Sequence, residues 1–131
     1  MDATHKSQID IDPAANMIAI TVVGDFGLEE MSAAFDNMLR DPLFRPGMDI
    51  VWDFRLANVR AAPGDPTRLT MHVRANRQRR GSNYRVAAVI TDPQAIALAH
   101  VYKALASDLI TEVKVFETLE AARAWLAAPT A

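Results

Sequence analysis

The stretch at residues 48–55, MDIVWDFR, constrains the fold of this chain more than any other. It is an apolar run that begins after Arg-Pro-Gly at 45–47 and ends on Asp53 and Arg55. Because sequences with helical periodicity flank it on both sides, it is predicted to be the central parallel strand of an α/β sheet. Open α/β sheets bind ligands at the carboxyl ends of their strands, so the irregular connection expected after Arg55 is the first place to look for a site.

Four other segments with the pattern of strands complete the predicted sheet. Residues 7–12 alternate polar and apolar, residues 17–23 are rich in β-branched side chains, and the turn residues between them predict an antiparallel hairpin. Residues 84–91 form a continuous apolar strand, and residues 112–116 alternate as the far edge strand. The chain is therefore predicted to be α/β, with a mixed five-stranded sheet that opens with an N-terminal antiparallel hairpin.

Helical periodicity predicts four helices, which are expected to lie mainly on one face of the sheet. They begin near Leu28, at Asp65-Pro66-Thr67, at Asp92-Pro93 and near Leu119, and the second is expected to run to about Arg80. If the helices cover mainly one face, the apolar strands need another cover on the opposite side. We therefore expect either a homodimer or a packed apolar cavity.

Composition limits the chemistry available to the chain. Its 131 residues are half apolar and 23% charged, which predicts one globular domain over residues 1–131. The sequence has no cysteine, which excludes disulfides, thiolate nucleophiles and cysteine zinc sites. Three scattered histidines form no metal signature, and no catalytic constellation is recognisable, so no metal, cofactor or enzymatic activity is expected. The net charge of −2 argues against a nucleic-acid partner.

The sequence also lacks the patterns of export and membrane insertion. Residues 1–6 have no apolar core of the kind found in a signal peptide. No apolar run approaches the roughly 20 residues that span a bilayer. The expected location is the cytoplasm, with no integral membrane segment.

Residues 7–128 resemble the SpoIIAA-like fold, which is shared by STAS domains of anti-sigma-factor antagonists and transporters and by SEC14-type lipid carriers. Three segments look more narrowly like a family of small uncharacterised bacterial STAS/SEC14-like proteins: DPLFRPGMD at 41–49, VWDFR at 51–55 and VKVF at 113–116. The resemblance implies a SpoIIAA-like (STAS) domain and a bacterial origin.

In regulatory STAS domains a phosphorylatable Ser, usually preceded by Asp, begins the helix after the central strand. The matching place here is Asp65-Pro66-Thr67, where Thr67 is the hydroxyl that remains. This chain departs from the pattern, because the Asp-Ser-Ser/Ala-Gly run is missing, a proline intrudes and the preceding loop is longer. A phosphate on Thr67 would be favoured by the helix N-terminus and disfavoured by Asp65. We prefer the interpretation that Asp65 caps the helix and Thr67 carries a solvated hydroxyl.

Two other groups of residues allow a structural and a functional interpretation. Asp53 and Arg55 form either a ligand site at a strand end or, as we prefer, one ion pair that holds the following loop. The second helix is strongly basic, and three of its side chains, Arg74, Arg77 and Arg80, are candidates for a surface that contacts an acidic protein. A solvated basic face is the simpler interpretation. Trp52 and Trp125 are most simply core residues, with an aromatic ligand platform as the alternative.

The leading functional hypothesis is a non-enzymatic regulatory or protein-interaction module of STAS type with an unknown protein partner. Its contact surface is expected to be the loop over residues 55–67 together with the basic helix. The alternative is a binder or carrier of a small apolar or lipid-like ligand, by resemblance to the SEC14 carriers. The two hypotheses differ in whether the protein holds an apolar molecule.

Overall fold

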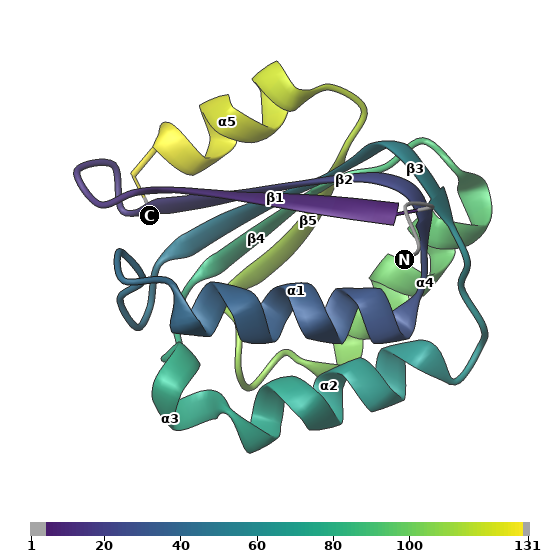
Figure 1. Cartoon of the computed structure of the whole chain (residues 1–131), viewed down its shortest axis with the longest axis horizontal. Coiled ribbons are helices and arrows are strands. Elements are labelled where there is room, and N and C mark those ends of the chain that lie inside the picture. The colour runs from purple at the N-terminus through teal and green to yellow at the C-terminus, as the bar shows by residue number, and fades with distance from the viewer. Residues whose placement is uncertain (1–4, 130–131) are drawn as a thin grey trace.

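The computed structural model describes residues 5–129 as a five-stranded sheet with helices on both faces (Figure 1). The strands are β1 (His5–Asp12), β2 (Met17–Phe26), β3 (Asp49–Val59), β4 (Arg85–Val89) and β5 (Glu112–Phe116). The helices are α1 (Leu28–Arg40), α2 (Asp65–Ala75), α3 (Arg77–Arg80), α4 (Pro93–Leu105) and α5 (Leu119–Ala127). The sheet order is β1-β2-β3-β4-β5, with β1 antiparallel to β2 and the other pairs parallel. The predicted mixed sheet, with its N-terminal hairpin and a central β3, is confirmed.

The β1–β2 hairpin is fixed by its turn and by its apolar alternation. Asn16 closes the turn with a positive φ of 55°, a conformation that Asn tolerates better than most residues. In the resulting register Ile9 lies opposite Ile20 and Ile11 opposite Ile18. These isoleucines all contribute to the same core, so a slip of one residue would turn them to the other face of the sheet.

The central strand is longer than predicted. It does not end at Arg55 but continues to Val59, so the irregular connection before α2 is shorter than expected. The reason is a shift in register: Thr21 lies opposite Asp53 and Val23 opposite Leu56, which leaves two residues of β3 facing one residue of β2. This β-bulge interrupts the apolar run. Residues after the bulge no longer follow a simple alternation of buried and exposed side chains, so the sequence pattern does not identify them as part of the strand.

Helices α1, α2, α3 and α4 cover one face of the sheet, and α5 covers the other (Figure 1). Alternate strand residues such as Ile20 and Trp52 form the larger core beneath α1, α2 and α4. Their neighbours, such as Val51 and Ala87, pack with Leu126 of α5 in a smaller core. Most helices therefore lie on one face, as predicted. No helix within residues 5–129 is long and apolar enough to cross a membrane.

The second predicted helix is broken, which gives five helices instead of four. Asn76 leaves the helical conformation (φ −109°, ψ 16°), and its side chain donates to the carbonyl of His72 at 2.9 Å. After α3, Gly81 adopts a φ of +82° and lies so close to Gly47 that a Cβ atom would approach the Gly47 nitrogen to 2.4 Å. Only glycine fits this contact. The junction packs α3 onto the start of β3, where Gly47 N donates to Arg80 O at 2.8 Å.

On the opposite face, Arg85 holds α5 against the sheet. Its Nη2 donates to Asp49 Oδ2 and to the carbonyl of Leu126, both at 2.8 Å, and its Nη1 donates to the carbonyls of Trp125 and Ala128. The last turn of a helix leaves carbonyls without intrahelical partners, and a nearby cation satisfies them and opposes the helix dipole. One side chain thus joins β3, β4 and the end of α5.

Candidate ligand-binding cavity

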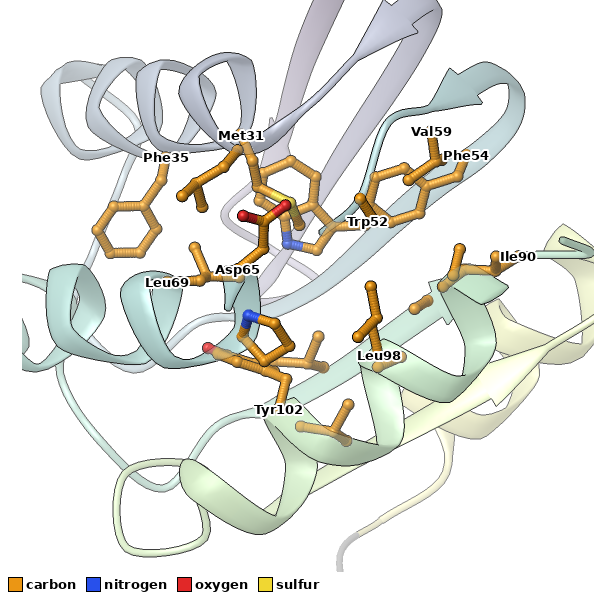
Figure 2. Close-up of a pocket in the computed structure, with 18 of the residues that line it drawn as sticks. Met31, Phe35, Trp52, Phe54, Val59, Asp65, Leu69, Ile90, Leu98 and Tyr102 are labelled. Atoms are coloured by element: carbon orange, nitrogen blue, oxygen red, sulfur yellow. The ribbon is translucent and has the colours of Figure 1, made fainter. Parts of the chain in front are cut away.

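A cavity of about 150 Å³ lies between the sheet and helices α1, α2 and α4 (Figure 2). Its wall is mainly apolar and comes from elements that are far apart in the sequence. The side chains that define it include Met31 and Phe35 of α1, Trp52 and Phe54 of β3, Leu69 of α2 and Leu98 of α4. The sequence predicted a homodimer or an apolar cavity as the cover of the face opposite the helices. The structure covers that face with α5, and its cavity lies on the helix-rich face instead.

Small side chains explain why the space is not filled. Ala88 lies on β4 opposite Trp52 of β3, and Ala95 and Ala99 lie on the facing side of α4. All three line the cavity, whereas the neighbouring strand contributes the much larger Trp52. Protein interiors normally contain few voids larger than a water molecule, so a space of this size is an unusual feature of a small core.

The cavity has a mouth and a closed end. Its partly exposed lining residues, among them Met31, Asp65 and Leu98, lie toward the carboxyl edge of the sheet. Figure 2 shows the Asp65 carboxylate between α1 and α2 at this mouth. The buried lining residues Arg80 and Tyr84 lie at the other end, near the amino termini of β3 and β4. The space therefore runs along the strands from a partly open end to a closed one.

The expectation that Asp65 caps α2 is wrong. Asp65 is the first residue of the helix, and its Oδ2 accepts the backbone N–H of Ala62 at 2.8 Å, which closes the preceding turn instead. Pro66 follows within the first turn, where no backbone N–H is needed, as predicted. Thr67 is exposed on α2.

The closed end of the cavity is polar. The Arg80 guanidinium lies over the Tyr84 ring, with Cζ 3.5 Å from the ring centroid, and its Nη2 donates to the carbonyl of Met48 at 2.7 Å. Burial lowers the pKa of Arg80 and raises the pKa of Tyr84. Tyr102 of α4 lies near this group, and burial raises the pKa of its phenol as well. One cation and two neutral phenols thus share the closed end of a mainly apolar space.

The expectation that Arg80 belongs to a surface for an acidic partner is therefore wrong. Arg80 is 1% exposed, because the break at Asn76 and the contact between Gly81 and Gly47 turn its side chain into the core. Arg74 is half-buried and already paired, with Nη2 3.1 Å from Asp108 Oδ1. This pair raises the pKa of Arg74 and lowers the pKa of Asp108. Of the three predicted arginines, only Arg77 has an exposed side chain that makes no hydrogen bond or ion pair to the residues described.

Asp53 and Arg55 form the ion pair that the sequence suggested, away from the cavity. Arg55 Nη2 donates to Asp53 Oδ2 at 2.8 Å, and Nε donates to Oδ1 at 2.9 Å. The backbone N–H of Arg55, at the β-bulge, also donates to Oδ1 at 3.1 Å. These hydrogen bonds from Arg55 hold the pKa of the 6%-exposed Asp53 below its usual value. The pair lies on the face covered by α5, so the structure does not bring it together with Asp65 and Thr67.

The described residues contain no cluster of three His, Asp or Glu side chains that could hold a metal ion. Trp52 is a core residue and also part of the cavity wall, so both interpretations of its role stay open. Trp125 of α5 packs against Phe116 of β5, with ring centroids 5.5 Å apart, and does not line the cavity. The arrangement at the cavity is suited to enclosing a small molecule with a mainly apolar surface.

Comparisons with known proteins agree with this architecture. A family model described as SpoIIAA-like matches residues 17–127. No curated protein matches the chain. Among solved structures, the chain is similar to an uncharacterised protein of the DUF3478 family with a SpoIIAA-like fold from Shewanella loihica PV-4. The sequence identity is 17%, the TM-score is 0.55, and the match covers 96% of this chain and 98% of that one. At this identity the likeness concerns the fold alone.

Proposed function

The chain belongs to the SpoIIAA-like family, and from this premise we propose that it is a non-enzymatic protein that binds and carries a small apolar molecule. The observation that carries the proposal is the apolar cavity of about 150 Å³ between the sheet and helices α1, α2 and α4. This choice favours the ligand-binding alternative over the interaction module that the sequence placed first.

The energetic cost of an unfilled cavity supports a binding role. Empty enclosed volume costs roughly 24 cal/mol per Å³, so 150 Å³ sets an upper bound of about 4 kcal/mol on the lost stability of a cavity that is partly open at its mouth. This is a large fraction of the 5–15 kcal/mol that typically stabilises a domain. A molecule that fills the space recovers part of this energy, and an engineered apolar cavity of similar volume in another protein binds benzene.

The character of the lining supports binding without catalysis. Among the lining residues that the structure describes, no Ser, Thr or His stands beside a general base. The polar side chains at the closed end are already engaged, since Arg80 bonds to Met48 O and stacks on Tyr84. Groups held in this way can orient a ligand but offer no activated nucleophile.

The two tryptophans provide a direct test, because Trp52 lines the cavity and Trp125 lies on the other side of the sheet. The variant Trp125→Phe retains Trp52 as its fluorophore, and Trp52→Phe retains Trp125. On titration with 1-hexanol, we expect a saturable change of emission in Trp125→Phe and no change in Trp52→Phe.

Calorimetry of the wild-type protein with 1-hexanol completes the experiment. No measurable heat and no emission change in either variant would remove the proposal. Binding that alters the emission of Trp125 instead would move the site away from the cavity. A native mass spectrum of the protein from its own cells, followed by extraction under denaturing conditions, then tests for a natural apolar ligand.

A second candidate, the protein-interaction module, is favoured by one surface of α2 and α3. Met71 is 65% exposed, and the exposed Arg77 and Arg79 are near it. We propose this surface as the contact for an acidic partner, with Arg79 in the place that Arg80 was expected to take. Arg77→Glu combined with Arg79→Glu should weaken binding of an acidic peptide and leave 1-hexanol binding unchanged. We also propose that the protein forms a homodimer, which sedimentation velocity tests, and that it is located in the cytoplasm.

A further inference from the structure

Arg80 is a buried cation without a carboxylate partner among residues 5–129. The ion pairs of this part of the chain involve other cations, namely Arg55, His72, Arg74, Arg85 and Lys103. Buried arginines are normally paired, because removing a charge from water is costly unless an opposite charge or several hydrogen bonds replace the water. At 1% exposure, Arg80 departs from this rule.

The contacts of Arg80 satisfy only part of its guanidinium. Nη2 donates to Met48 O at 2.7 Å, and one face of the group lies on the Tyr84 ring, with a second ring, Phe44, 5.7 Å from Cζ. Nη1 is the one buried side-chain nitrogen or oxygen of the described residues that has no hydrogen-bond partner among them. Arg80 also lines the cavity, so this unused donor belongs to a side chain at the cavity's closed end.

The acidic group whose charge acts on Arg80, Asp49, is engaged elsewhere. Asp49 Oδ2 accepts from Arg85 Nη2 at 2.8 Å, and Oδ1 accepts the backbone N–H of Arg85 at 2.8 Å. Tyr84 and Tyr102, which share the closed end, are neutral phenols and do not balance the charge. The cavity therefore ends in a positive charge that the described protein groups do not neutralise.

We propose that the molecule held in this cavity is a small apolar carboxylic acid, whose carboxylate pairs with Nη1 of Arg80 while its apolar part lies along the wall toward Trp52. This inference rests on the proposed function, since it names the class of ligand for the same cavity. A carboxylate matches the planar fork of a guanidinium and satisfies a buried N–H with a charge-assisted hydrogen bond. The volume of about 150 Å³ limits the ligand to a short aliphatic or single-ring acid.

Three probes of the same chain length test the proposal by isothermal titration calorimetry at neutral pH: hexanoic acid, hexanamide and hexylamine. We expect the wild-type protein to bind hexanoate about tenfold or more tightly than hexanamide, as a hydrogen bond to a charged group predicts. Arg80→Met keeps an apolar stem over Tyr84 and should lose this preference while still binding hexanamide. Arg79→Met removes an exposed cation outside the cavity and should keep the preference.

The outcomes separate the ligand class from the proposed function. Equal affinity of the wild-type protein for hexanoate and hexanamide overturns the carboxylate, because the neutral amide oxygen then serves Nη1 equally well, but leaves the cavity as a binding site. Tighter binding of hexylamine than of hexanoate also overturns the carboxylate, and indicates that Asp65 at the mouth selects a cationic ligand. Failure of all three probes removes the proposed function itself. If Arg80→Met does not fold, Arg80→Lys keeps the charge without the fork and should show a reduced preference for hexanoate.

Discussion

Ala87 and Ala88 are consecutive residues of β4 whose side chains lie on opposite faces of the sheet. Ala88 lines the cavity beneath α4, whereas Ala87 is fully buried in the smaller core beneath α5. Replacing either alanine with valine adds the same two methyl groups to the same strand. The pair therefore separates the effect of filling a cavity from the effect of enlarging a side chain in β4.

The expected changes in the free energy of unfolding have opposite signs. Filling space beside Ala88 buries two methyl groups at about 0.8 kcal/mol each, and restricting the new side chain offsets part of that gain. Ala88→Val should therefore raise the free energy of unfolding by about 1 kcal/mol. Ala87 borders no comparable space, so Ala87→Val should lower it by about 1–3 kcal/mol through overpacking.

Urea unfolding of ligand-free protein measures both values, and unchanged m-values identify a change in stability alone. Ala88→Val should also weaken 1-hexanol binding, because its methyl groups occupy the same volume, and Ala87→Val should leave the affinity unchanged. Equal destabilisation by the two substitutions would refute the reasoning, since it would mean that the face of β4 beneath α4 is packed as tightly as the face beneath α5.

Two further predictions concern the other face of the sheet. Because Arg55 lowers the pKa of Asp53 below 3.8, their pairing should stabilise the protein above that pH and cease to do so as the pH falls below it. Arg55→Met should therefore be less stable than the wild type in urea at neutral pH, with the difference shrinking below pH 3.8; a difference independent of pH would contradict this assignment. Arg85→Met should cost about 3 kcal/mol, because it leaves Asp49 and the end of α5 without their partner. The exposed Arg79→Met should change the stability by less than about 0.5 kcal/mol in the same assay, and equal effects would contradict the role given to Arg85.

The order of strands and helices could be predicted from the sequence, because the apolar residues that form each buried face recur with the period of a strand or of a helix. The apolar runs around Trp52 and Val89 identified β3 and β4, and the alternation at Ile9 and Ile11 identified the edge strand. The end of β3 was missed because the bulge after Asp53 shifts the alternation by one residue. Strand pairing with β2, which is a contact between distant segments, extends the strand beyond that point.

The break between α2 and α3 had no comparable signal. Asn76 is neither glycine nor proline, and a basic segment without either residue is consistent with one continuous helix. The burial of Arg80 depends on the contact between Gly81 and Gly47, which are far apart in the sequence. Nothing in a row of arginines distinguishes the one that turns inward, so Arg80 was assigned to the surface.

The position of the cavity was not predicted, because the sequence suggested a cavity only as one of two covers for the face opposite the helices, and α5 covers that face. The cavity exists because the side chains of the surrounding elements do not fill the space between them. These elements are β3, β4, α1, α2 and α4. Ala88, Ala95 and Ala99 carried a partial signal, because they are small residues at positions that face a core. Whether small residues leave a void or allow closer packing is decided by the positions of the helices, which the sequence pattern does not contain.

The contacts of Arg80 determine how the two ends of the cavity differ. At the closed end, Arg80 O accepts from Gly47 N and Nη2 donates to Met48 O, so the residue joins α3 to the start of β3 through both its backbone and its side chain. The mouth, in contrast, lies among the first turns of three helices and the connection before Asp65, where the lining residues are partly exposed. Because the closed end is fixed by a positive φ at Gly81 and a buried guanidinium, we expect a ligand to enter at the mouth. A molecule with a negatively charged end and an apolar tail then fits the cavity in one orientation, with its negative charge at Arg80 and its tail toward the mouth.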